Sequence, residues 1–156
     1  MNQFRRTFLK GAGAAGTVAV AVAAGLLKPT QVLAAEWNKT GFTATKLDEA
    51  LKSIGGTGAA ESKDIIVKAP DIAENGAVVP VEIESKIPGT TSIALIIETN
   101  LNPLCSTYDF SNGALGYVST RVKMAKSSKV RAIVKAGGKT YTAAKEVKVT
   151  IGGCGG

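Results

Sequence analysis

The sequence predicts an all-β domain: an immunoglobulin-like antiparallel β-sandwich of about seven strands, with one N-terminal helix and a C-terminal Gly-Gly-Cys-Gly-Gly arm. Two observations predict the sandwich. Beyond Gly58, apolar and polar residues alternate with a period of two, which is the period of a half-buried strand. The runs are short and regularly spaced, with turn signals between them, as is typical of a sandwich. The chain divides into a leader (1–35), a sandwich domain (36–151) and the arm (152–156).

The leader reads as an export signal. Arg5 and Arg6 begin the twin-arginine motif Arg-Arg-Thr-Phe-Leu-Lys. An apolar run over 11–27 follows, and the small residues Ala34 and Ala35 offer a cleavage site. The alternative is a membrane anchor, but the run is rich in alanine and glycine and falls short of about 20 strongly apolar residues. We therefore expect a periplasmic protein with no membrane anchor after cleavage.

One helix is predicted between the leader and the strands. Thr45 is a suitable N-cap, and Asp48 stands three positions on, where a capping box places its acidic residue. Gly55 and Gly56 end the helix, since glycine readily takes the left-handed C-terminal conformation. We expect its apolar stripe to cover the edge or end of a sheet; the stripe consists of Leu47, Ala50, Leu51 and Ile54.

Three strands are predicted in the first half of the domain. Residues 64–69 form a short β-branched run, and 79–84 alternate between apolar and polar side chains. Pro80 cannot donate to a ladder, so it predicts an edge position for the second of these. Residues 92–98 are apolar on both faces, which predicts a central strand.

The second half predicts four more strands and two tight turns. The strands are expected at 107–110, 118–124, 130–135 and 140–151. Asn112-Gly113 is a tight-turn signal, and Gly137-Gly138 predicts a two-residue hairpin into the last strand. That strand runs directly into the arm, with Ile151 as its last side chain to bury.

Charge and composition exclude several classes of function. The leader holds four of the 19 Lys+Arg and none of the 12 Asp+Glu, so the net charge falls from +7 to +3 once it is removed. This modest charge and the few aromatic residues disfavour a nucleic-acid partner. The chain has no histidine, which removes the usual base for a nucleophile. It also disfavours a metal site, since the two cysteines, Cys105 and Cys154, have no ligand spacing.

The charge is unevenly distributed along the mature chain. Residues 36–104 carry a net charge of −4, whereas residues 105–156 carry +7. A positive field near Cys154 would attract small anions and favour its thiolate. The alternative is that these lysines serve only solubility, on the wet faces of strands.

The C-terminal arm carries the candidate site. Cys154 lies between two pairs of glycines, which add no packing and order at the highest entropic cost. The pattern predicts a thin, mobile arm that brings one thiol into narrow clefts of other proteins, with flexibility from Gly152, Gly153, Gly155 and Gly156. A disulfide to Cys105, or a frayed tail, is the alternative; neither requires glycine on both sides.

Together, the twin-arginine leader, the small β-sandwich and the terminal Gly-Gly-Cys-Gly-Gly resemble the SoxY family, the carrier subunits of the periplasmic thiosulfate-oxidising system. The resemblance implies that Cys154 binds thiosulfate-derived sulfur covalently, and that the chain is a carrier with no cofactor rather than an enzyme. It implies a heterodimer with a SoxZ-like β-sandwich subunit. It also implies transient contact with a haem c thiosulfate-conjugating enzyme, a sulfate-releasing hydrolase and a sulfur dehydrogenase.

Cys105 has no role in this scheme, and we expect it to be a buried small hydrophobe. Two rival functions remain. A ubiquitin-like sulfur carrier also ends in Gly-Gly but needs ATP, which stays in the cytoplasm. An exported immunoglobulin-like structural or adhesion module would carry Cys154 incidentally.

Overall fold

The computed structural model describes residues 37–151, which form two short helices and nine strands. The leader and the arm lie outside the described residues. The helices are α2 (Lys39–Thr43) and α3 (Leu47–Ser53). The strands are β1 (Ala60–Glu61), β2 (Ile65–Lys68), β3 (Ile72–Asn75), β4 (Val79–Ser85), β5 (Thr90–Ile97), β6 (Leu104–Asp109), β7 (Tyr117–Val122), β8 (Ser128–Ala136) and β9 (Lys139–Ile151). The all-β class is therefore confirmed.

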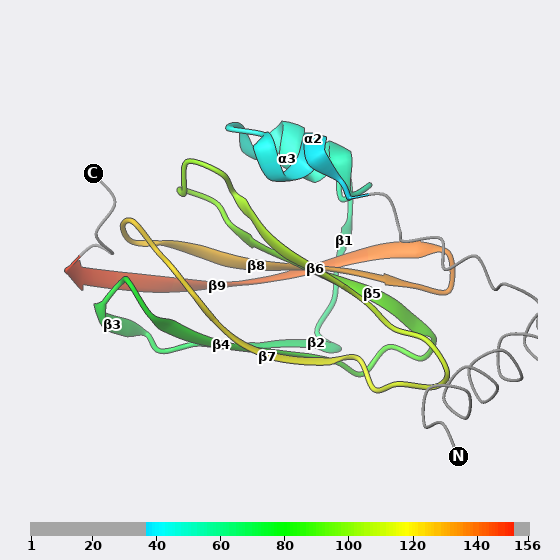
Figure 1. Ribbon diagram of the computed structural model, residues 1–156. Helices are drawn as coiled ribbons and strands as arrows, with labels where there is room; N and C mark the ends of the chain where they lie inside the picture. Colours follow the sequence, from blue (N-terminus) through cyan, green and yellow to red (C-terminus); the bar gives the residue numbers. More distant parts are fainter. Residues whose placement is uncertain (1–36, 152–156) are drawn as a thin grey trace, which may run out of the picture. The chain divides into compact units, whose positions relative to one another are not determined.

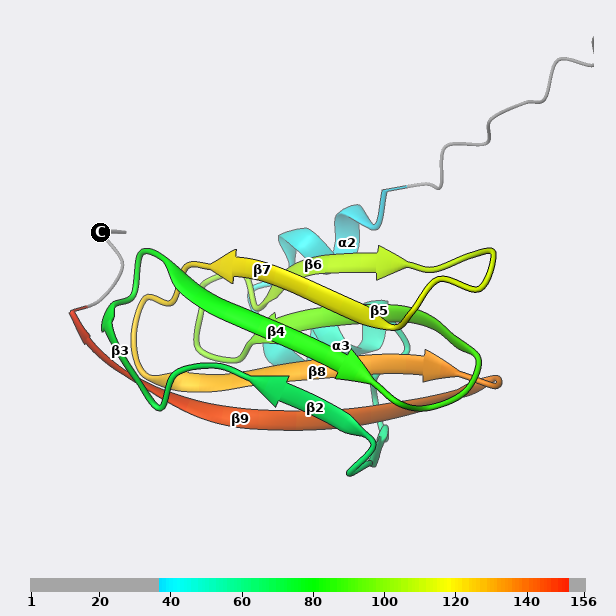
Figure 2. The same ribbon diagram turned by 90° about the horizontal axis from the view of Figure 1, so that it is seen from below.

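The strands form two sheets that face each other (Figures 1 and 2). The larger sheet has the order β1-β9-β8-β5-β6, with β3 also paired to β9, and the smaller has the order β2-β4-β7. The prediction of a purely antiparallel sandwich is wrong at one edge, because β1 and β3 both run parallel to β9. The finer, immunoglobulin-like assignment stays a prediction.

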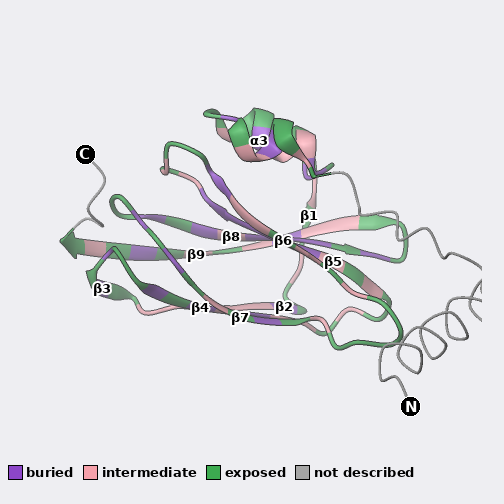
Figure 3. Ribbon diagram, viewed as in Figure 1, coloured by how far each residue is buried: buried purple, intermediate pink, exposed green. Residues whose placement is uncertain are grey.

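The core lies between the sheets, where buried residues line both inner faces (Figure 3). β5 pairs with β6 on one side and β8 on the other, so the predicted central position of 92–98 is confirmed. The main contributors are Val79, Val81 and Ile83 of β4, Ile93, Leu95 and Ile97 of β5, and Val130, Ala132 and Val134 of β8. Each large apolar side chain buried in this way contributes about 1.5–3 kcal/mol.

The helices cover the outer face of the larger sheet (Figure 1). Ala50 and Ile54 pack in one cluster with Ala94, Ile96 and Ile133 of β5 and β8. The expectation that the helical stripe covers a sheet edge or end is therefore wrong. Because β5 is apolar on both faces, its outer side needs cover as much as its inner side does.

The start of the helical region also differs from the prediction. There are two helices rather than one, and α3 has Lys46 at its N-cap, without a side-chain cap hydrogen bond, rather than Thr45. Asn38 caps α2 instead: its side chain accepts from the Gly41 N–H at 2.9 Å and donates to the Ser53 carbonyl at 3.1 Å. This one side chain ties α2 to α3. The predicted end of α3 is confirmed, with Gly55 at φ +67°.

Two strands, β1 and β3, were not predicted, and the position of β4 was predicted wrongly. β4 lies between β2 and β7 and is not an edge strand. Pro80 is tolerated there because β2 pairs only with Glu82–Ser85, so Pro80 lies beyond the end of β2. β1 and β3, with two and four residues, are too short to show an alternating pattern.

Both predicted turns are confirmed. Gly137 and Gly138 have φ angles of 55° and 74°, and the flanking Ala136 and Lys139 pair directly, so β8 and β9 form a two-residue hairpin. Asn112 and Gly113 also have positive φ, but their turn joins strands of different sheets.

Candidate functional site: the arm-bearing end of the sandwich

The predicted site residues lie beyond the described part of the chain. Cys154, the arm glycines Gly152, Gly153, Gly155 and Gly156, and the export residues Arg5 and Arg6 all fall outside residues 37–151. What the structure does describe is the root of the arm, where β9 ends at Ile151.

The root of the arm is held from one side by β3 and the turn that follows it. Asn75 pairs with Ile151, and the Gly76 N–H donates to the Ile151 carbonyl at 2.8 Å. The Thr150 hydroxyl donates to the Glu74 carbonyl at 3.1 Å. The last residues of β9 are therefore hydrogen-bonded up to the point where the arm begins.

The 123–127 loop, between β7 and β8, lies next to this root. The Met124 N–H donates to the Gly76 carbonyl at 2.7 Å, and Gly76 in turn binds Ile151. The Ser127 hydroxyl accepts from the Val149 N–H at 2.9 Å. Neighbouring hydrogen-bonded segments lie about 4.8 Å apart, so two such steps place Met124 within about 10 Å of Ile151.

This loop is basic and braced. Lys123 and Lys126 are exposed. The Asn100 side chain donates to the Lys123 carbonyl at 2.7 Å and accepts from the Ala125 N–H at 3.1 Å. A shallow cleft of about 320 Å³ opens here, lined by Asn100, Leu101, Asn102, Lys123 and Ala125.

Several large apolar side chains are exposed around the same end. Leu101 is 77% exposed, and Ile151 is 69% exposed. Ile72 of β3 and Val78, which follows the β3 turn, are more than half exposed. The arm therefore leaves the domain from a surface that combines lysines with apolar side chains.

Cys105 is a free, half-buried thiol on β6 that packs against the core cluster. Burial raises the pKa of this thiol, and hydrogen bonding to the Ile97 backbone and the Asn100 side chain only lowers it in part. Because a thiol with a raised pKa is a poor nucleophile near neutral pH, the environment of Cys105 fits the expected small hydrophobe.

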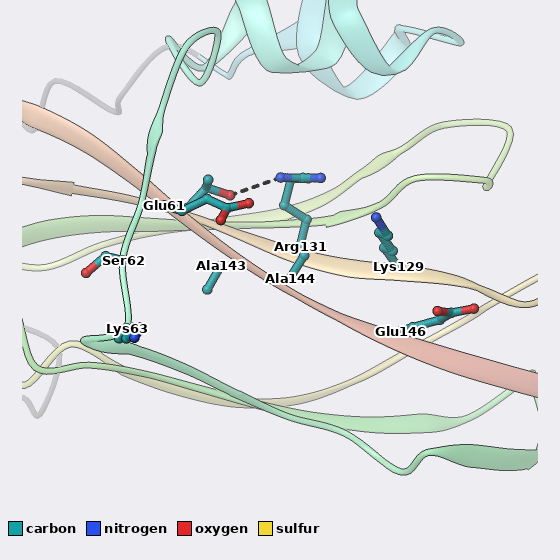
Figure 4. A pocket seen from close by; sticks show the side chains of 9 residues that line it. Glu61, Ser62, Lys63, Lys129, Arg131, Ala143, Ala144 and Glu146 are labelled. Atoms are coloured by element: carbon teal, nitrogen blue, oxygen red, sulfur yellow. Dashed lines mark hydrogen bonds between the residues drawn. The ribbon is translucent and has the colours of Figure 1, made fainter.

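A second hollow lies on the outer face of the larger sheet, beside the β1 edge (Figure 4). Arg131 stands at its centre and donates to the Thr142 hydroxyl at 3.3 Å. Two nitrogens of Arg131 contact one carboxylate oxygen of Glu98, Nη2 at 2.6 Å and Nε at 2.7 Å. The positive charge of Arg131 is thus already neutralised, so we assign it a structural role.

Within residues 37–151 no group of three or more His, Cys, Asp or Glu side chains is placed to hold a metal ion. In the same range, neither helix has the length and apolar character needed to cross a bilayer.

Sequence reasoning missed the structural surroundings of the arm. The net charge of the C-terminal half pointed to cations near Cys154, but it did not identify the 123–127 loop. The contacts that bring Gly76 and Asn100 to this end connect segments 23–75 positions apart, and no local pattern encodes them.

The comparisons with known proteins agree with this architecture. Residues 51–154 match the family model described as "Sulfur oxidation protein SoxY". The structure of the sulfur carrier protein SoxY from Chlorobium limicola f thiosulfatophilum is 44% identical, covers 68% of this chain and 97% of its own, and superposes with a TM-score of 0.61. A superoxide reductase (neelaredoxin) from Ignicoccus hospitalis is 20% identical over 70% of this chain and 97% of its own, with a TM-score of 0.49, which is too distant to inform on function.

No curated protein matches the chain. The family match spans two thirds of the sequence and ends at Cys154, the residue on which the predicted chemistry depends. Most of the sandwich and the greater part of the arm therefore align with one family, and the chain belongs to the SoxY family.

Proposed function

We propose that this protein is a periplasmic sulfur carrier that binds thiosulfate-derived intermediates covalently on Cys154. The observation that carries the proposal is the family match, which extends through the arm to Cys154. The solved relative described as a sulfur carrier protein supports it at 44% identity. The hydrogen-bonded root at Ile151 fits a swinging arm, because it marks a sharp change from an anchored strand to a glycine-rich segment.

The proposed chemistry takes place on the Cys154 sulfur. Thiosulfate joins the thiol to give a cysteine S-thiosulfonate, with loss of one proton and of two electrons, which the haem c conjugating enzyme accepts. Water then attacks the terminal sulfonate sulfur, the S–S bond to it breaks, and hydrogensulfate leaves a persulfide on Cys154. A sulfur dehydrogenase oxidises that remaining sulfur. The chain itself supplies the nucleophile and the reach.

The partners follow from the same proposal. We infer a heterodimer with a SoxZ-like β-sandwich subunit, and passing contact with the three enzymes named above. The exposed apolar side chains Leu101 and Ile151, together with Leu115 at 84% exposure, support the presence of a partner surface. The twin arginines Arg5 and Arg6 support export of the folded chain.

The experiment compares Cys154→Ser with Cys105→Ser. Each variant is incubated with thiosulfate and the partner enzymes, and its intact mass is recorded with and without reductant. Cys154→Ser should carry no reducible sulfur, whereas Cys105→Ser should load normally, because Cys105 is half-buried and its thiol is hard to ionise. A clean mass in the unsubstituted protein would favour the structural module, and modification at Gly156 would favour a carboxylate carrier.

A further inference from the structure

The 123–127 loop has a position and a charge that the carrier reaction does not use. We propose that this loop is the resting site of the loaded arm. Its lysines, Lys123 and Lys126, hold the anionic sulfur group on Cys154 between visits to partner enzymes. The inference rests on the proposed function, because it requires a charged sulfur adduct on Cys154.

The arm is long enough to reach this loop. Three residues separate Cys154 from Ile151, and three extended residues span about 10 Å. The hydrogen bonds through Gly76 place Met124 within about the same distance of Ile151. An arm folded back over the β3 turn therefore brings the Cys154 adduct to the side chains on either side of Met124.

The charges are complementary. A thiosulfonate carries one negative charge, and the C-terminal carboxylate of Gly156 adds a second within the same arm. Lys123 and Lys126 are exposed on the neighbouring loop. Two acidic side chains that lie towards this end are already engaged, Glu98 by Arg131 and Asp71 by Lys145 at 3.0 Å.

The loop is also a fixed surface rather than a loose one. Asn100 braces its backbone at two points, and Ser127 binds Val149 of β9. The cleft beside Lys123 offers a recess about 320 Å³ in size, with the exposed Leu101 on its wall. A recess with a lysine at its side suits a small anion attached to a thin chain.

The docking must be weak if the arm is to leave for each enzyme. Exposed ion pairs are weak, and salt screens them within about 8 Å at physiological ionic strength. Two such pairs shift the arm towards the loop several-fold without trapping it. The loop would shield the adduct from bystander thiols while leaving it available to a partner with a stronger site.

The test loads Cys154 chemically, so that no partner enzyme is needed. Tetrathionate reacts with the thiol to give the S-thiosulfonate, one thiosulfate and one proton. As a matched neutral adduct, methyl methanethiosulfonate gives the methyl disulfide and methanesulfinic acid. Mass analysis of the C-terminal peptide confirms each product, and backbone amide resonances are then recorded by NMR.

The charged adduct should shift the amide signals of residues 123–127, and the neutral adduct should leave them largely unchanged. The shifts should shrink by about three-fold or more in Lys123→Gln/Lys126→Gln, as expected for the loss of two weak ion pairs. They should also shrink in roughly 0.5 M salt, where screening shortens to a few ångströms. The control Lys86→Gln/Lys139→Gln removes two exposed lysines from the opposite end of β4 and β9 and should change nothing.

Equal shifts with both adducts, or shifts unaffected by Lys123→Gln/Lys126→Gln, would overturn the resting site. Because loading is chemical, that result leaves the carrier function standing. If the partner enzymes fail to load Cys154, the carrier proposal fails instead, whatever the NMR comparison shows.

Discussion

At the scale of single residues, the outer face of the larger sheet depends on one ion pair. Arg131 and Glu98 have side chains that are only 24% and 19% exposed. Arg131 also binds the hydroxyl of Thr142, which is itself buried and donates to the Ala132 carbonyl at 3.1 Å. The group therefore links β5, β8 and β9 on the side that the helices leave open.

Replacing Glu98 with Gln should destabilise the protein by about 1–2 kcal/mol, because it leaves a partly buried guanidinium without its counter-charge. Urea unfolding at pH 7 measures the change in the free energy of unfolding. Glu82→Gln is the matched control: it breaks the exposed Lys68–Glu82 pair, 3.7 Å long, and should cost less than about 0.5 kcal/mol. Equal costs for the two variants would show that Arg131 needs no counter-charge.

At the scale of elements, the β8–β9 hairpin sets the register of the strand that carries the arm. Its turn residues Gly137 and Gly138 both have positive φ, and a Cβ at either position would meet nothing within 4 Å. The cost of a side chain there is therefore one of backbone conformation alone.

Gly138→Val should lower the free energy of unfolding by about 1–2 kcal/mol, since a β-branched residue is strained at φ 74°. Gly137→Asn should be close to neutral, because Asn-Gly is a favoured pair in this turn type. Urea midpoints of the two variants against the unsubstituted protein measure both effects. A neutral Gly138→Val would mean that the turn can adopt another geometry without loss.

The elements predicted from sequence are those with long periodic patterns or glycine pairs. β5, β8 and β9 alternate or run apolar over eight residues or more, and Gly137-Gly138 fixes its own turn. α2 and β3 were missed because their five and four residues are held by distant partners, Ser53 for α2 and β9 for β3. Thr45 failed as a cap because a favourable residue type does not by itself fix where a helix starts.

At the scale of the whole molecule, the division of the chain into leader, sandwich and arm came from composition alone. The sequence identified Cys154 because a thiol between glycine pairs is poor core material. It could not identify the surface around the arm, because that surface combines residues from the β3 turn, the β5–β6 connection and the 123–127 loop. Only the folded topology brings these segments together.

Export is the prediction that concerns the whole chain. Changing Arg5 and Arg6 together to Lys should leave the precursor unprocessed in the cytoplasm, because the twin arginines are the address. Fractionation followed by intact mass of each fraction measures both location and cleavage. Replacing Lys10 and Lys28 with Gln is the control: it removes leader charge but keeps the arginine pair, so export should continue. Normal periplasmic accumulation of the lysine pair would show that another feature directs the protein.

The pairing of β9 on both sides also determines how the domain responds to tension. An enzyme that draws the arm into a deep cleft pulls β9 along its own axis. β9 is joined to β8 by nine residue pairs and, at its final residues, to β3. A pull in this direction loads those hydrogen bonds in shear and all at once, whereas peeling a strand would break them one by one. The sandwich therefore resists extraction as a fixed anchor, and the stroke available to Cys154 is set by the contour length of the residues after Ile151.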